Sequence, residues 1–180
     1  MNDRQSWRPK RHKTPVWAAV GVAVGLLLVA LPAQAGSCSV SSSGLAFGAY
    51  QPLSFAGKLH SVDRTSSANI VVTCTGIATG GSYVLTLGPS TYGSGNRISP
   101  RWLPNLGQAG DPMQFNVYTD PTCSSIWSDG VSAGPPFTGS IPAGDSQRSH
   151  TAYGRIPGGQ STLKAGQYAD TLTMTLTFTP

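Results

Sequence analysis

The chain has 180 residues, with 12 Lys and Arg, 7 Asp and Glu, and a formal net charge of +5 at pH 7. The first 35 residues hold five of the basic residues and Asp3, so the other 180 − 35 = 145 carry 7 − 6 = +1. The basic isoelectric point is therefore no sign of nucleic-acid binding, and we expect no nucleic-acid partner. Those 145 residues lack Glu and are rich in Gly, Ser, Thr and Pro, which is typical of one all-β secreted domain with many turns.

Residues 1–35 predict a secretory signal peptide. A basic segment with Arg4, Arg8 and Lys10 precedes an apolar run over residues 16–31, and Ala33-Gln34-Ala35 is a small-x-small site, so we expect cleavage after Ala35. The run is shorter than the roughly 20 residues that a spanning helix needs. A retained membrane anchor is one alternative. A lipid on Cys38 is another, because Ala35-Gly36-Ser37-Cys38 is a loose lipobox.

The rest of the chain predicts short strands joined by turns. An irregular first strand, interrupted by Gly44 and Gly48, is expected over residues 39–50. Further strands are expected over residues 68–75, 81–88, 113–119 and 150–156, with a short apolar run at Ile126-Trp127. Residues 89–112 and 130–145 are rich in turn-forming residues and predict loops. No useful helical periodicity occurs beyond the leader, so the fold class is all-β, a β-sandwich.

The segment 171–179 alternates threonines with Leu172, Met174, Leu176 and Phe178, and the chain as given stops one residue later. This period of two places the four apolar side chains on one face of a final strand. A long apolar strand in this position presents an edge that needs a neighbour. Either an earlier strand covers it, or another polypeptide does.

Cys38, Cys74 and Cys123 follow the predicted cleavage site, and in an oxidising compartment they predict one disulfide and one free thiol. Three pairings are possible, and spacing alone does not choose among them. Cys123 follows the turn sequence Asp120-Pro121-Thr122 and is expected in or beside a loop.

The residues predict no catalytic centre, metal site or cofactor. His60 and His150 do not match the Cys/His spacing of a zinc site, and the aspartates lie in turn sequences. Ser124 and Ser125 lack the surroundings of a nucleophile elbow. Aromatic residues in or beside loops could instead bind a sugar or another surface, and the candidates are Trp102, Tyr92 and Phe137.

An ordered series of short stretches resembles the spore coat protein U domain family, which includes archaic chaperone–usher pilins. The stretches span nearly all of residues 38–180. They are Cys38-x-Val40, Leu45-x-Phe47-Gly48-x-Tyr50-x-Pro52-Leu53, Val71-x-Thr73-Cys74-Thr75, Tyr83-x-Leu85-x-Leu87, Phe115-Asn116-Val117-Tyr118-Thr119-Asp120, Ile126-Trp127-x-Asp129-Gly130, Tyr153-Gly154-Arg155-Ile156-Pro157 and Gly166-x-Tyr168-x-Asp170-Thr171.

The resemblance implies an incomplete immunoglobulin-like sandwich over residues 36–180 that lacks its final strand. It implies that a periplasmic chaperone lends the strand, that an outer-membrane usher assembles the subunits, and that a neighbouring pilus subunit later supplies the strand. The strand with Leu172, Met174, Leu176 and Phe178 would then border an acceptor groove. The resemblance also maps a disulfide onto Cys38 and Cys74, which leaves Cys123 as the free thiol.

The chain departs from that pattern before Cys38, where cleavage after Ala35 leaves only Gly36-Ser37 and no alternating donor extension. We therefore expect a secreted, non-enzymatic pilus subunit at the cell surface that takes a tip or terminal position. Two other functions stay open at this point. One is an adhesin module that binds carbohydrate, a host or an abiotic surface, and the other is a coat protein that stands alone.

Overall fold

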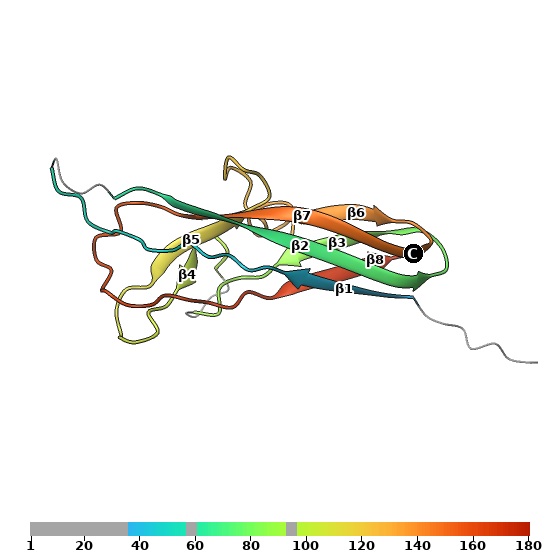
Figure 1. Cartoon of the computed structure of the whole chain (residues 1–180), viewed down its shortest axis with the longest axis horizontal. Helices are drawn as coiled ribbons and strands as arrows, with labels where there is room; N and C mark the ends of the chain where they lie inside the picture. Colours follow the sequence, from blue (N-terminus) through green and yellow to red (C-terminus); the bar gives the residue numbers. More distant parts are fainter. Residues whose placement is uncertain (1–35, 57–60, 93–96) are drawn as a thin grey trace, which may run out of the picture. The chain divides into compact units, whose positions relative to one another are not determined.

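Residues 36–56, 61–92 and 97–180 are described by a computed structural model, and they form eight β-strands and no helix (Figure 1). The predicted signal peptide at residues 1–35, its cleavage site and His60 lie outside the described residues. None of the described segments forms an apolar helix of membrane-spanning length. The strands are β1 (Ser37–Ser42), β2 (Arg64–Ile77), β3 (Gly81–Leu87), β4 (Arg101–Leu103), β5 (Met113–Tyr118), β6 (Phe137–Ile141), β7 (Gly144–Ile156) and β8 (Met174–Thr179).

The strands form two antiparallel sheets, as an immunoglobulin-like sandwich requires. One sheet has the order β1-β2-β7-β5-β4, and the other has the order β6-β3-β8. The long strands β2 and β7 pair along most of their length and form the middle of the larger sheet (Figure 1). Alternate residues of β2, including Ile70, Val72 and Cys74, are fully buried and form one core with buried residues of β3 from the facing sheet and of β5. The all-β prediction is thus confirmed.

Two of the predicted loops contain strands. Residues 89–112 include β4, which pairs with β5 so that Arg101 lies opposite Phe115 and Leu103 opposite Met113. Residues 130–145 include β6 and the first residues of β7. The predictions of loops were wrong because these short strands are stabilised by pairing with β5 and with β3, whereas the composition of their own segments favours turns.

The first strand is shorter than predicted. It ends at Ser42, and Gly44 then takes a positive φ of 75°. Leu45 and Phe47 leave the sheet and cross over Gly154 of β7, where a Cβ atom would lie 2.6 Å from Phe47 Cζ. Only glycine admits that crossing, which brings both side chains onto the core.

The last strand begins at Met174, three residues later than predicted. Thr173 still accepts a hydrogen bond from Gly88 N at 2.9 Å, but Leu172 lies before the strand. Leu172 nevertheless packs on the core on the same face as Met174, Leu176 and Phe178.

Candidate functional site

Strand β8 lies at the edge of the three-stranded sheet. It pairs with β3 from Ser82–Thr179 to Leu87–Met174, and the described residues place no strand along its other side. Every second backbone N–H and C=O of such a strand points away from its one neighbour. The edge is therefore able to pair with one further strand.

The side chains of β3 and β8 that face the core differ in burial although they lie directly opposite each other. The pairs are Tyr83–Phe178, Leu85–Leu176 and Leu87–Met174. The β3 members are 2%, 0% and 4% exposed, whereas all three β8 members are only partly buried. The two members of each pair lie side by side, so their position along the strands does not explain the difference in exposure. The β8 side chains are more exposed because, among the described residues, no strand lies along the other side of β8.

Strand β1, at the edge of the larger sheet, lies near the uncovered side of β8. It is the edge strand beside β2, and parts of β1 and β8 approach within 8 Å between Cα atoms without pairing. Its inward residues, Cys38 and Val40, are also only partly buried. We call this region the open edge. It comprises β1, β8 and the apolar side chains Cys38, Val40, Leu172, Met174, Leu176 and Phe178, which pack against the core without being fully covered.

The open edge carries no charged residue in either of its strands. The outward side chains are hydroxyls on both sides, namely Ser37, Ser39 and Ser41 of β1 and Thr175, Thr177 and Thr179 of β8. A ligand here would thus meet apolar side chains inside, hydroxyls outside and free backbone groups between them. This chemistry suits a polypeptide in extended conformation.

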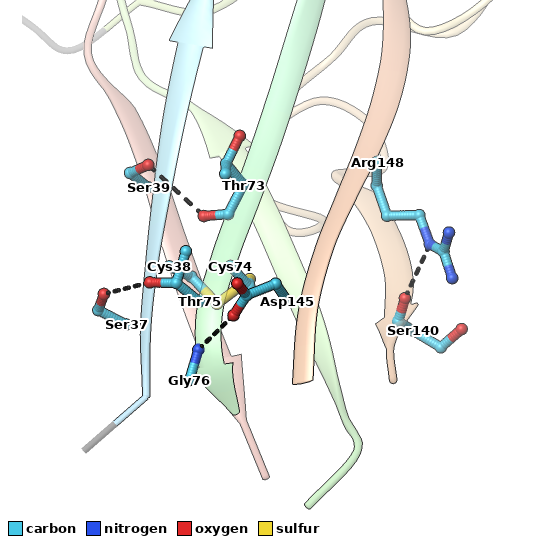
Figure 2. Close-up of a disulfide and its surroundings, with 10 residues drawn as sticks. All are labelled: Ser37, Cys38, Ser39, Thr73, Cys74, Thr75, Gly76, Ser140, Asp145 and Arg148. Atoms are coloured by element: carbon cyan, nitrogen blue, oxygen red, sulfur yellow. Dashed lines mark hydrogen bonds between the residues drawn. A yellow bond between two sulfur atoms is a disulfide. The ribbon is translucent and has the colours of Figure 1, made fainter. Parts of the chain in front are cut away.

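A disulfide joins Cys38 to Cys74, directly across the β1–β2 pair, with an S–S distance of 2.02 Å (Figure 2). Ser37 Oγ and Thr75 Oγ1 lie 3.3 Å apart beside it, and Gly76 N donates to Asp145 Oδ1 of β7 at 2.8 Å. The bond ties β1, at the open edge, to its neighbour β2. It also occupies the sulfur that a lipid would need, so the lipoprotein alternative does not fit.

The family model of the Spore Coat Protein U domain matches residues 23–175. The chain belongs to the Spore Coat Protein U domain family. Among curated proteins, none matches the chain. The family is associated with chaperone–usher pili and other surface structures, and this Spore Coat Protein U domain belongs to that class of surface proteins. The suspected family is thereby confirmed.

The three predicted surface aromatics have different environments in this Spore Coat Protein U domain. Trp102 belongs to β4 and is partly buried, so its prediction as a loop residue was wrong. Phe137 lies in β6, where its ring stacks on His150 at 4.5 Å and contacts Trp127 at 4.8 Å. Tyr92 is exposed, at 43%.

Cys123 is a free, buried thiol of the domain. It lies in a turn with a φ of 53°, as its position after Asp120-Pro121-Thr122 suggested. Burial raises the pKa of the Cys123 thiol, which keeps it protonated. Hydrogen bonds from Thr122, Ser124 and Ser125 hold the pKa of Asp120 well below its usual range. The same hydrogen bonds to the Asp120 carboxylate hold this turn together.

Two polar clusters of the domain have structural roles. Arg101 is fully buried and donates to Asn116 Oδ1 at 2.6 Å and to the carbonyl oxygens of Leu87, Gly88 and Trp127. Burial lowers its pKa to about 10, and it stays charged at neutral pH. Sequence reasoning missed it, because a lone Arg in a Pro-rich segment gives no signal of burial.

Tyr83 and His150 form the second cluster, with 2.6 Å between Tyr83 Oη and His150 Nε2. Burial raises the pKa of Tyr83 and lowers that of His150, so both are neutral near pH 7. Ser124 and Ser125 hydrogen-bond to Asp120. Within the described ranges no group of three His, Cys, Asp or Glu side chains is arranged around a metal.

Proposed function

We propose that this domain is a structural subunit of a cell-surface pilus, and that the open edge accepts a β-strand donated by another polypeptide. The observation that carries the proposal is the burial difference across the β3–β8 pairs. Leu85 is 0% exposed, whereas Leu176 directly opposite is only partly buried. A strand laid along β8 would pair with its free backbone groups and cover Met174, Leu176 and Phe178.

The energetics favour such a partner. Fully burying an aliphatic or aromatic side chain stabilises a protein by roughly 1.5–3 kcal/mol. The side chains of the open edge are only partly buried, so they contribute only part of this free energy. A domain is stable by about 5–15 kcal/mol in total. Covering several of these side chains together therefore changes a large fraction of the stability, and the domain without its partner is expected to be marginal.

The donated strand also requires movement. A strand paired to both β1 and β8 needs about two strand spacings, or roughly 9.6 Å, between them. Parts of the two strands approach within 8 Å, so they must separate there to admit it. We propose that a periplasmic chaperone supplies the first strand and that an outer-membrane usher exchanges it for a neighbouring subunit's strand.

We propose further that the subunit ends a fibre. Cleavage after Ala35 would leave Gly36 alone ahead of β1, since Ser37 already pairs with Thr75. Strand donation needs several consecutive residues for its ladder and side-chain pockets. Immunogold labelling of assembled fibres tests this position. Label confined to tips is expected, and regular label along the shaft would show that the subunit extends the fibre.

A peptide-binding experiment tests strand acceptance. The secreted protein is mixed with a synthetic peptide that alternates Val or Ile with Thr, and unfolding is followed by circular dichroism. Peptide at 100 times its Kd should stabilise the protein by about 2.7 kcal/mol. Leu176→Asp should abolish binding, because a lone carboxylate would lie in the apolar opening. Thr177→Asp is the matched control, since its side chain faces outward on the same strand.

The same experiment separates this proposal from a coat protein that stands alone. A monomer that unfolds cooperatively and is indifferent to every alternating peptide would contradict strand acceptance. In cells, wild-type protein should accumulate to a higher level with a co-expressed chaperone than without one, and Leu176→Asp should not be captured.

A further inference from the structure

A hollow of about 440 Å³ is lined by Tyr92 and the loop 104–110, none of which belongs to the open edge. Its volume falls in the range of roughly 300–1,000 Å³ that is typical of small-ligand sites. Tyr92 is 43% exposed, and Leu106 of the facing loop is 63% exposed. An aromatic ring left in water beside a hollow is a common element of recognition sites.

The backbone under Tyr92 is held firmly. Asp170 accepts hydrogen bonds from Ser90 Oγ at 2.7 Å, from Thr91 N at 3.0 Å and from Thr91 Oγ1. Ser90 Oγ also lies 2.7 Å from the carbonyl oxygen of Trp102 and accepts from Tyr92 N at 3.2 Å. The segment that presents the ring is therefore anchored through Asp170 to the approach to β8, which limits the entropy lost on binding.

The facing loop is anchored as well. Asn105 Oδ1 accepts from Gly107 N at 3.0 Å and from Gln108 N at 3.2 Å, so this side chain shapes the loop. Leu106 N donates to Gln167 O at 2.8 Å, and Lys164 Nζ donates to Ala109 O at 2.7 Å. Both walls of the hollow are thus fixed before any ligand arrives.

The chemistry of the lining narrows the ligand class. Tyr92 and residues 104–110 carry no charge, and the ammonium group of the neighbouring Lys164 is bonded to Ala109 O, which disfavours a phosphate or a carboxylate as the main determinant. Both walls are loop segments, so they offer no ladder to an extended peptide. Tyr92 offers an apolar face, the exposed Gln108 offers a side-chain amide, and the exposed small residues Gly107, Ala109 and Gly110 leave room beside them for a ligand.

We propose that this hollow binds an uncharged saccharide. A sugar ring has one face of C–H groups that stacks on Tyr92 and a rim of hydroxyls that hydrogen-bond to Gln108 and to the loop backbone. The site is independent of strand acceptance, since it uses neither β1 nor β8. It would give the domain a ligand of its own at a cell or glycan surface.

Titration of the secreted full-length protein with cellobiose, maltose, lactose and N,N′-diacetylchitobiose tests the proposal, with binding followed by NMR chemical shifts. At least one of these should bind saturably at millimolar concentration. Tyr92→Ala should weaken it about tenfold, as expected for loss of a stacked ring, and Tyr92→Phe should retain it. Val131→Ala removes a 93% exposed side chain elsewhere and serves as the control.

Matched unfolding midpoints ensure that the variants are folded. Absence of binding by all four sugars up to 50 mM would overturn the proposal, and so would binding that Tyr92→Ala leaves unchanged. Two further probes test the ligand class. Digalacturonic acid or a phenylalanine-containing tripeptide binding at Tyr92, without any of the neutral sugars, would also overturn it.

Discussion

Strands β3 and β8 pair with each other and present the same kind of side chains to the same core, yet only β3 is covered on both sides. β3 lies between β6 and β8, whereas the described residues supply β8 with one neighbour. Leu85 and Leu176 are directly opposite, and Leu176 alone keeps contact with solvent. Burial in a sheet is thus set by the number of neighbouring strands as well as by the side chain. An exposed apolar strand edge marks a binding site.

The largest expected effect comes from truncating the two opposed leucines. Leu85→Ala should destabilise the protein by about 2–5 kcal/mol, as for other fully buried leucines. Leu176→Ala should cost less than half as much in the free protein, because part of the side chain is already in water. With a donated peptide bound, the cost of Leu176→Ala should rise towards that of Leu85→Ala. Urea unfolding measures both, and equal costs in the free protein would contradict the comparison.

A somewhat smaller effect is expected from the disulfide that fixes β1 at the open edge. Replacing both Cys38 and Cys74 by Ala should destabilise the protein by about 3–4 kcal/mol through the entropy of the reopened loop. Cys123→Ala, which removes a buried thiol outside any disulfide, should change the stability by about 1 kcal/mol or less. Guanidinium unfolding measures both. Non-reducing peptide mapping gives an independent check, and a Cys74–Cys123 peptide would contradict the assignment.

The smallest expected effect is a loss of stability in acid. It tests the surroundings of the covered strand β3, because Tyr83 of this strand is hydrogen-bonded to His150. Burial lowers the pKa of His150 from its ordinary value of 6.5, so the unfolded chain binds the proton more readily. Stability should therefore be complete above pH 6.5 and should fall as pH drops through the window below it. His150→Gln should flatten the slope of stability against pH in that window. An unchanged slope would contradict the role of His150. Asp120 and Asp129 act in a separate, more acidic window, because hydrogen bonds lower the pKa of each carboxyl.

The alternation of polar and apolar residues correctly predicted the strands in which it is regular. The alternation after Thr171 predicted β8 and its inward residues, because a period of two needs no distant information. The family resemblance, and not the spacing, predicted the pairing of Cys38 with Cys74. Strand β6 escaped prediction because its partner β3 lies far away in sequence, and β4 escaped because three residues are too short to show an alternation.

The same limit applies to the site residues. Leu45 and Phe47 were expected within a strand, but they leave the line of β1 and pack over Gly154, a contact between distant segments. Trp102 and Phe137 were expected on surfaces because their segments look like loops, and both belong to strands. Tyr92 could not be ranked above them from sequence, since its exposure depends on how the loop 104–110 folds back.

Hydrogen exchange along β8, residue by residue, tests the central claim most directly. In the free protein, alternate amides of Met174–Thr179 should be protected by β3, and the amides between them should exchange quickly because they face outward. A bound alternating peptide should protect this second set and leave the first unchanged. Uniform protection along β8 in the free protein would show that the edge is already covered, and the account of a strand-accepting subunit would be wrong.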